Sequence, residues 1–290
     1  MGDGAVRIDA HHHFWDPARY VYPWMEGSAM DRVRRRFSPE DLRGELAKAG
    51  IDGTVLVQTL SSLDESREFL EIASRWEWVL GVVGWVDLAA DDVSDQLDQL
   101  RASPGGERLV GVRHQVHDEE DPRWLCRAEV RRGLAAVASR GLTYDLLLRA
   151  REIPAATETA QALPELSFVV DHIGKPRIVD GSDPAWEAGM PGLAALGNVQ
   201  VKLSGMVTEA GWTSWTPADL RPFVSRVMDL FGTERLMFGS DWPVCLLAVP
   251  SYEDVIAALE EALGDLSDDE SRQLFGANAQ RFYGLALPSD

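Results

Sequence analysis

Short β-rich segments alternate with amphipathic, helix-like segments along almost the whole chain, and this alternation restricts the possible folds most strongly. We expect eight strands, at residues 6–13, 53–59, 79–88, 109–116, 142–148, 167–172, 199–204 and 235–241. We expect helices at residues 38–49, 64–76, 91–101, 123–140, 153–163, 217–231, 252–263 and 268–283. This pattern in 290 residues predicts an α/β fold, a (β/α)8 TIM barrel that forms a single domain over residues 1–290. An open, doubly wound sheet fits less well, because no glycine-rich phosphate-binding turn follows the first strand.

The composition argues against several classes of partner. Asp and Glu number 47 against 28 Lys and Arg, and the resulting net charge of −19 repels nucleic-acid phosphates and anionic membrane surfaces. No apolar run approaches the ~20 residues of a membrane span, and no signal-peptide pattern begins the sequence. The two cysteines, Cys126 and Cys245, lack the spacing of a disulfide framework or zinc site. We therefore expect a cytoplasmic protein that binds neither nucleic acid nor membrane, and no oligomeric state is predicted.

Residues 14–37 form the longest early connection and are rich in Trp, Tyr and Arg. Long connections inside compact domains commonly carry function. The segment is expected either to cover the mouth of the barrel as a lid or to pack against its rim. Among the tryptophans on expected loops, Trp24 and Trp242 are the candidates for stacking on a substrate ring.

The first strand ends in three consecutive histidines. Side chains alternate along a strand, so His11 and His13 share one face and His12 lies on the other. The face of His11 and His13 is expected to include Asp9 and to point into the barrel mouth, where enzymes of this fold place their chemistry. The residues of the apolar face are expected to point toward the helices: Val6, Ile8 and Ala10.

Two further strand ends carry ligand-type side chains, His172 after the sixth strand and Asp241 after the eighth. Such polar ends do not suit a buried strand unless something binds to them. Together with His11 and His13 they form a set of nitrogen and oxygen ligands typical of one zinc or similar divalent ion. The alternative is that each residue is only hydrogen-bonded to its neighbours, an explanation that fits a single strand-end residue better than four of them.

Two strands are expected to turn basic side chains inward, as candidate substrate-binding residues. Lys202 has the opposite orientation to the apolar residues of the seventh strand, so it is either a substrate contact or a partner in a salt bridge within the barrel. Arg113 on the fourth strand points inward by the same alternation, whereas the direction of His114 is ambiguous near the strand end.

Five segments resemble the amidohydrolase superfamily, within its amidohydrolase-2 branch: IDAHHHFWDP, VGVRHQVHDEEDPRWL, FVVDHIGKP, VKLSGM and RLMFGSDWPV. They are most similar to the sugar-lactonase-like group, which includes L-fuconolactonase- and L-rhamnonolactonase-like proteins. The resemblance implies a barrel with its site at the mouth, on His11, His13, His172 and Asp241. Many superfamily members also carry a bridging Lys or Glu after the fourth strand and a His after the fifth. Here those ends carry Arg113 and Asp145, which disfavours a two-metal site.

The resemblance implies hydrolysis of a sugar-derived lactone of the L-fucono-, L-galactono- or L-rhamnono- type. In that reaction Asp241 would act as general base on water. His172 and the other histidines would polarise the carbonyl, either through one divalent ion, zinc by preference, or directly, since related pyrone-dicarboxylate lactonases act without a metal. Arg113, Lys202 and His114 would hold the lactone oxygens. The alternatives are a dicarboxylate lactone, for which the strand ends offer few cations, a decarboxylation, and a non-catalytic sugar-binding barrel that would not need a base.

Overall fold

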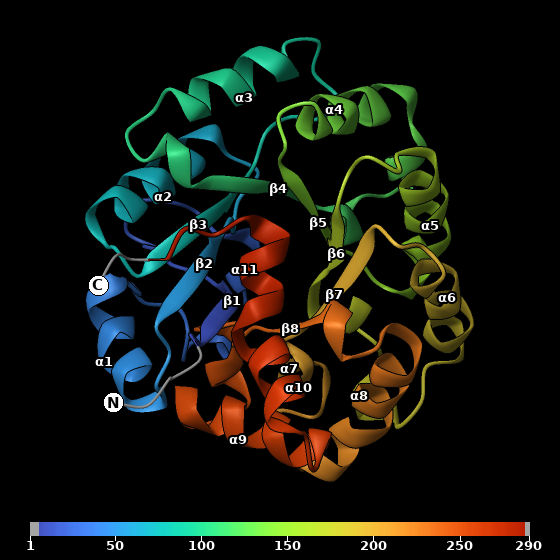
Figure 1. The fold of residues 1–290 in the computed structure, drawn as a ribbon. Coiled ribbons are helices and arrows are strands. Elements are labelled where there is room, and N and C mark those ends of the chain that lie inside the picture. Colours follow the sequence, from blue (N-terminus) through green and yellow to red (C-terminus); the bar gives the residue numbers. More distant parts are fainter. Residues whose placement is uncertain (1–5, 288–290) are drawn as a thin grey trace.

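The computed structural model describes residues 6–287, and its eight strands form one parallel sheet in the order β1 to β8 (Figure 1). The strands are β1 (Ile8–His12), β2 (Gly53–Val57), β3 (Val79–Gly84), β4 (Leu109–Gln115), β5 (Thr143–Leu147), β6 (Phe168–Val170), β7 (Val199–Leu203) and β8 (Leu236–Phe238). The sheet closes just beyond β1 and β8, where Asp241 N donates to His11 O at 2.8 Å and His13 N donates to Trp242 O at 2.7 Å. The predicted (β/α)8 barrel is confirmed.

Helices surround the strands (Figure 1). They are α1 (Pro39–Ala49), α2 (Leu63–Arg75), α3 (Val93–Arg101), α4 (Ala128–Ala138), α5 (Ile153–Ala162), α6 (Pro184–Ala194), α7 (Met206–Glu209), α8 (Pro217–Phe231), α9 (Tyr252–Leu263), α10 (Asp268–Arg272) and α11 (Asn278–Tyr283). The predicted start of α1 is correct: Pro39 occupies its first turn and Ser38 precedes it. No helix among residues 6–287 is both long and apolar enough to cross a membrane.

Helix α6 is not predicted by the sequence pattern, because its two prolines and two glycines obscure the helical periodicity. Pro184 stands in the first turn, where a missing N–H costs nothing, and the Asp183 side chain accepts from Trp186 N at 3.1 Å. Gly189 permits close packing on α5, since a Cβ there would lie 2.8 Å from Ile153 Cγ2. The helix therefore depends on its neighbour more than on its own propensity.

The C-terminal helix α11 lies across the barrel axis in Figure 1 and closes the end of the barrel opposite the mouth. Its Tyr283 belongs to the buried apolar cluster that also contains Ile8, Val169 and Met237, from β1, β6 and β8. The Tyr283 hydroxyl donates to Asp145 Oδ2 at 2.9 Å, inside the barrel. A functional site can therefore lie only at the opposite end of the barrel, at the carboxyl ends of the strands.

The expected orientation of β1 is wrong over its first half. Ile8 and Ala10 pack into the barrel interior rather than toward the helices. Asp9 points outward, where its carboxylate accepts from the Tyr252 hydroxyl of α9 at 2.9 Å. The register between β1 and β2 is irregular between Asp9 and His12, which reverses the alternation and returns the following histidines to the mouth.

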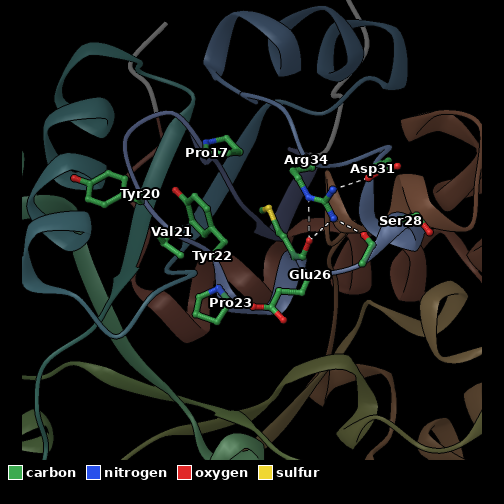
Figure 2. Close-up of a pocket in the computed structure, with 11 residues that line it drawn as sticks. Pro17, Tyr20, Val21, Tyr22, Pro23, Glu26, Ser28, Asp31 and Arg34 are labelled. Carbon is green, nitrogen blue, oxygen red and sulfur yellow. Dashed lines mark hydrogen bonds and ion pairs between the residues drawn. The ribbon is translucent and has the colours of Figure 1, made fainter.

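Residues 14–37 pack against the rim of the barrel. Trp15 and Phe37 form an antiparallel bridge, and both side chains are buried together with Tyr22. The segment also forms a surface pocket of about 710 Å³ (Figure 2). In this pocket Arg34 donates to the backbone oxygens of the segment and pairs with Asp31 at 2.6 Å.

A buried carboxylate organises the connection after β2. Glu65 on α2 accepts from the backbone N–H groups of Thr59 and Leu60, each at 2.8 Å, although its side chain is almost fully buried. Burial raises the pKa of Glu65 to about 7, above its ordinary value of 4.5.

Glu65→Gln is expected to reduce the pH dependence of stability between about pH 4.5 and 7. Below this range Glu65 is protonated in both the folded and the unfolded chain. Within it the unfolded chain loses the proton first, so the native state loses stability at up to about 1.4 kcal/mol per pH unit as the pH rises. Burial also raises the pKa values of Asp9 and Asp145 to about 6, but these residues contribute equally to the pH dependence of the wild-type protein and of the variant. Urea unfolding at several pH values measures the difference, and equal slopes for the two proteins would contradict this assignment.

Candidate active site

The carboxyl ends of the strands surround a cavity of about 350 Å³. Its lining comes from the segment after β1 and from the ends of β2 and β4 to β8: His13, Trp24, Met30, Thr59, Arg113, Gln115, His117, Asp118, Leu147, Arg149, His172, Lys175, Thr208, Glu209, Trp212, Asp241, Val244 and Leu247. The charged members are three cations, Arg113, Arg149 and Lys175, and three carboxylates, Asp118, Glu209 and Asp241. The cavity is therefore close to neutral in formal charge within an acidic chain.

Three histidines converge on the Asp241 carboxylate at the bottom of this cavity. Asp241 Oδ1 lies 3.3 Å from His13 Nε2, 3.9 Å from His11 Nε2 and 4.0 Å from His172 Nε2. His11 Nε2 and His13 Nε2 are 3.2 Å apart. The four side chains predicted as metal ligands, which follow or end strands β1, β6 and β8, thus meet at one point.

The other ring nitrogen of each histidine is held from behind. His13 Nδ1 donates to Val57 O at 2.7 Å, and His172 Nδ1 lies 2.9 Å from Ser204 Oγ. His11 Nδ1 lies 3.3 Å from Asp171 Oδ1. These contacts direct the three Nε2 atoms toward Asp241, as in metal sites where a second contact orients each imidazole. Burial lowers the pKa of His11, His13 and His172, so all three rings are neutral at pH 7.

The backbone reaches two of these positions in a strained conformation. His172 and Asp241 both have φ values of +55°, in the left-handed region that side chains other than glycine rarely adopt. Gly205 lies directly against His172, and a Cβ at this glycine would come 2.5 Å from His172 Nδ1. The close approach lets Ser204 reach the imidazole, so a glycine is required here.

Below the histidines lies a buried network of two carboxylates and two cations. Asp171 pairs with Lys202 at 3.0 Å and with Arg113 at 3.0 Å, and Lys202 pairs with Asp145 at 2.6 Å. Burial alone would raise the pKa of Asp171, but Lys202, His11 and Arg113 hold this pKa well below its usual range. The negative charge of Asp171 is thereby kept next to His11.

Asp241 is ionised at neutral pH. Its burial would raise the pKa, but His172, His13 and Lys175 outweigh this effect and leave the pKa below the ordinary value. A buried, ionised carboxylate next to three neutral imidazoles can accept a proton, bind a cation, or do both in different steps.

The predicted site residues divide into those that line the cavity and those that do not. His13, His172, Asp241, Arg113 and Trp24 line it. His11 lies directly beneath, fully buried, with its Nε2 3.2 Å from Arg113 Nη1.

Lys202 does not reach the cavity. It is fully buried, and its ammonium lies between Asp145, Asp171 and His11 Nδ1, the last at 3.1 Å. Of the two expected roles, the structure therefore supports the salt bridge within the barrel rather than a direct substrate contact.

His114 and Trp242 also lie outside the cavity lining, contrary to their expected contact with substrate. His114 stacks on Trp124 with ring centroids 4.3 Å apart, and Trp85 and Glu119 occupy its two nitrogens. Trp242 is buried between Phe14 and Phe37, with ring centroids 6.1 Å and 5.2 Å away. Each ring is therefore engaged by other residues of the protein.

Three charged residues at or below the cavity are not among the site residues predicted from the sequence. Asp171 follows the inward-facing Val169 by two positions, so strand alternation was a usable signal for it. Arg149 and Glu209 lie in connections after β5 and β7. Their direction depends on the conformation of those connections, which no local pattern encodes.

The residues fit a single divalent ion. One ligand atom each of His11, His172 and Asp241 lies within 4.8 Å of the others, and His13 Nε2 is near both His11 and Asp241. Neutral imidazoles with oriented second nitrogens and an ionised carboxylate are the donors that zinc prefers. Arg113 occupies the place beside His11 where a second cation would be repelled.

Residues 8–285 match the profile of the family described as Amidohydrolase. The chain is 38% identical to the L-fucono-1,5-lactonase of Burkholderia ambifaria over 288 residues, which cover 98% of this chain and 97% of that one. The L-fucono-1,5-lactonase of Burkholderia multivorans is also 38% identical, and 99% of each chain is covered. A crystal structure of an amidohydrolase from Burkholderia multivorans with bound zinc superposes with a TM-score of 0.90 at 35% identity, covering 97% of this chain and 100% of that one.

The purified protein is expected to hold at most about one divalent ion per chain, bound by nitrogen and oxygen ligands. His11→Ala should lose the ion, because it removes a converging ligand. The control is His12→Gln, since His12 points away from the cavity and is hydrogen-bonded to Thr54 at 2.8 Å. Elemental analysis after dialysis measures occupancy. Two tightly held ions would contradict a single site, whereas no ion together with full activity in chelator would favour catalysis by the imidazoles alone.

Proposed function

This chain belongs to the amidohydrolase family, and from that membership we propose that it is a hydrolase that opens sugar-derived lactones of the L-fucono-, L-galactono- or L-rhamnono- type. The observation that carries the proposal is the convergence of His11, His13 and His172 on the ionised Asp241 at the bottom of a cavity. The identity of 38% to L-fucono-1,5-lactonases over nearly the whole chain supports the same reaction and substrate class. Such a reaction would belong to carbohydrate metabolism.

In the proposed mechanism Asp241 removes a proton from the attacking water, whose oxygen forms a bond to the lactone carbonyl carbon. The Nε2 atoms of the neutral histidines present lone pairs that would hold a divalent ion beside the carbonyl oxygen, and Arg113 adds a fixed positive charge beside His11. As the tetrahedral intermediate collapses, the bond from the carbonyl carbon to the ring oxygen breaks. Asp241 returns its proton to this ring oxygen, and the product is an open-chain hydroxy acid.

We propose that His11, His13, His172 and Asp241 hold one divalent ion, zinc by preference. When bound, the ion would polarise the ester carbonyl and lower the pKa of water. The neutral state of the three histidines supports this assignment, because a metal ligand must be deprotonated. The zinc in the Burkholderia multivorans amidohydrolase supports the choice of metal.

The cavity favours a neutral, hydroxyl-rich ligand over a dianionic one. Arg113 is paired with Asp171, and Lys175 and Arg149 share the one carboxylate of Glu209. Among the residues that line the cavity, these pairs leave at most one positive charge uncompensated, which is too few for two substrate carboxylates. The arginines of residues 14–37 do not line the cavity. Trp24 and Trp212 do line it, and they offer aromatic surface to the apolar face of a sugar ring.

We also propose a cytoplasmic location. Both cysteines are free thiols, Cys126 half-buried and Cys245 buried, which suits a reducing compartment. Small-molecule lactones are the proposed partners of the cavity.

Asp241→Asn is expected to lower kcat by at least ~100-fold, because it removes the general base. The matched control is Asp118→Asn, which removes the same charge from the cavity rim, where the Asp118 side chain is 67% exposed. The control should retain turnover within a few-fold. Lactone opening can be followed with a pH indicator, and circular dichroism checks that both variants fold. Near-normal turnover in folded Asp241→Asn would remove this residue from the mechanism.

The protein is expected to hydrolyse L-fucono-, L-galactono- or related aldonolactones at least about tenfold more efficiently than any dicarboxylate lactone. A tenfold ratio needs only ~1.4 kcal/mol of differential transition-state binding, less than the cost of leaving one substrate carboxylate unpaired in the cavity. Comparison of kcat/KM for the two substrate classes tests this. A preference for the dicarboxylate would overturn the sugar-lactone assignment and leave the hydrolase assignment intact.

A further inference from the structure

Three charged side chains from successive connections meet on one wall of the cavity, and the mechanism above gives none of them contact with the substrate. Lys175 Nζ lies 2.8 Å from Glu209 Oε1, and Arg149 Nη1 lies 3.4 Å from Glu209 Oε2. Arg149 follows β5, Lys175 follows β6, and Glu209 ends α7 after β7. All three line the cavity, and the Glu209 side chain is only 13% exposed.

The backbone fixes this group relative to the reacting residues. Lys175 and His172 belong to the same left-handed turn, with φ values of +47° and +55°. Trp186 Nε1 donates to Ile173 O in this turn at 2.6 Å and so anchors it to α6. On the other side, Glu209 lies on the short helix that begins directly after Gly205, which packs on the His172 ring. The position of the group is thus set by the elements that set the position of His172.

The chemistry of the group suits sugar hydroxyls. Each carboxylate oxygen of Glu209 is engaged by one cation and keeps a further lone pair. Among residues 6–287, Lys175 and Arg149 have no other side-chain acceptor, so each has N–H groups left to donate. A hydroxyl both donates and accepts, and it can bridge Glu209 to either cation. Two neighbouring hydroxyls can do so simultaneously, one on each oxygen.

We propose that Glu209, held between Lys175 and Arg149, binds neighbouring hydroxyls of the lactone and sets the preference for hydroxylated over unsubstituted lactones. This inference rests on the proposed lactone hydrolysis. It assigns Glu209 to binding rather than to bond breaking, because the proposed mechanism already has Asp241 as the general base and the histidines at the carbonyl. The competing explanation is an ion pair that only stiffens the rim. That role would affect all lactones equally.

The test compares a hydroxylated lactone, L-fucono-1,5-lactone, with δ-valerolactone, an unsubstituted six-membered lactone. Glu209→Gln should lower kcat/KM for the sugar lactone at least about tenfold, because hydrogen bonds to a charged group are lost, and change that for δ-valerolactone less than about threefold. Arg149→Met, which removes the other cation paired with Glu209, should act in the same direction. The double variant should lose less than the product of the two single effects, since both residues serve the same hydroxyls.

Glu158→Gln is the matched control. Glu158 is also a carboxylate between two arginines, Arg123 at 2.7 Å and Arg131 at 2.9 Å, but it lies on the surface of α5 outside the cavity. Neither substrate should respond to this change. Thermal melting of all variants separates loss of binding from loss of structure.

A parallel decrease for both lactones in Glu209→Gln would overturn the proposal, and so would an unchanged ratio. If the wild-type protein hydrolysed neither lactone, the proposed function would fail instead. The binding role would then be decided by calorimetry with L-galactono-1,4-lactone. Binding that weakens at least about tenfold in Glu209→Gln but not in Glu158→Gln supports it, and equal binding overturns it.

Discussion

The histidines at the mouth depend on the buried charge network beneath them. Asp145, Lys202, Asp171 and Arg113 form an alternating series of acids and bases inside the barrel, and His11 contacts its centre. Removing a central member, Asp171 or Lys202, would leave the end charge beside it buried without its ionic partner, at a cost of about 3–5 kcal/mol. Hydrogen bonding of Tyr283 to Asp145 extends the network to the closed end of the barrel. The C-terminal helix therefore supports the site from a distance as well as completing the fold.

The strained backbone at the mouth is tolerated because the barrel closes there. Residues in the left-handed region cost of order 1–3 kcal/mol each and persist only when their surroundings hold them. Asp241 is held on both sides, since its N–H donates to His11 O at 2.8 Å and its carbonyl accepts from Cys245 N at 2.9 Å. The first of these bonds also joins β1 to the segment that follows β8. The hydrogen bond that helps to close the sheet therefore also fixes the position of the Asp241 carboxylate.

Sequence patterns correctly predicted the features that depend on a regular alternation of residues or elements. They failed where this alternation is interrupted. The alternation of strands and helices gave the barrel, and alternation within β7 gave the inward direction of Lys202. The irregular register of β1 reversed Asp9, although the direction of His11 and His13 was correct. Inward direction alone does not distinguish a cavity wall from a buried ion pair, which is why Lys202 was ambiguous. Trp242 and His114 lie outside the cavity because of partners distant in sequence, which local patterns do not reveal.

The charge distribution suits a reaction that turns a neutral substrate into an anion. Opening a lactone at neutral pH yields a carboxylate, and the chain carries a net charge of −19. A neutral lactone meets no repulsion from this field, whereas the anionic product is driven outward. Free cations in the cavity would retain the product by forming ion pairs with it. Because Arg113, Lys175 and Arg149 are already paired with Asp171 and Glu209, they can donate to hydroxyls and to the carbonyl region without offering a strong anion site. Pairing within the protein thus reconciles recognition of a polar ligand with release of a charged product.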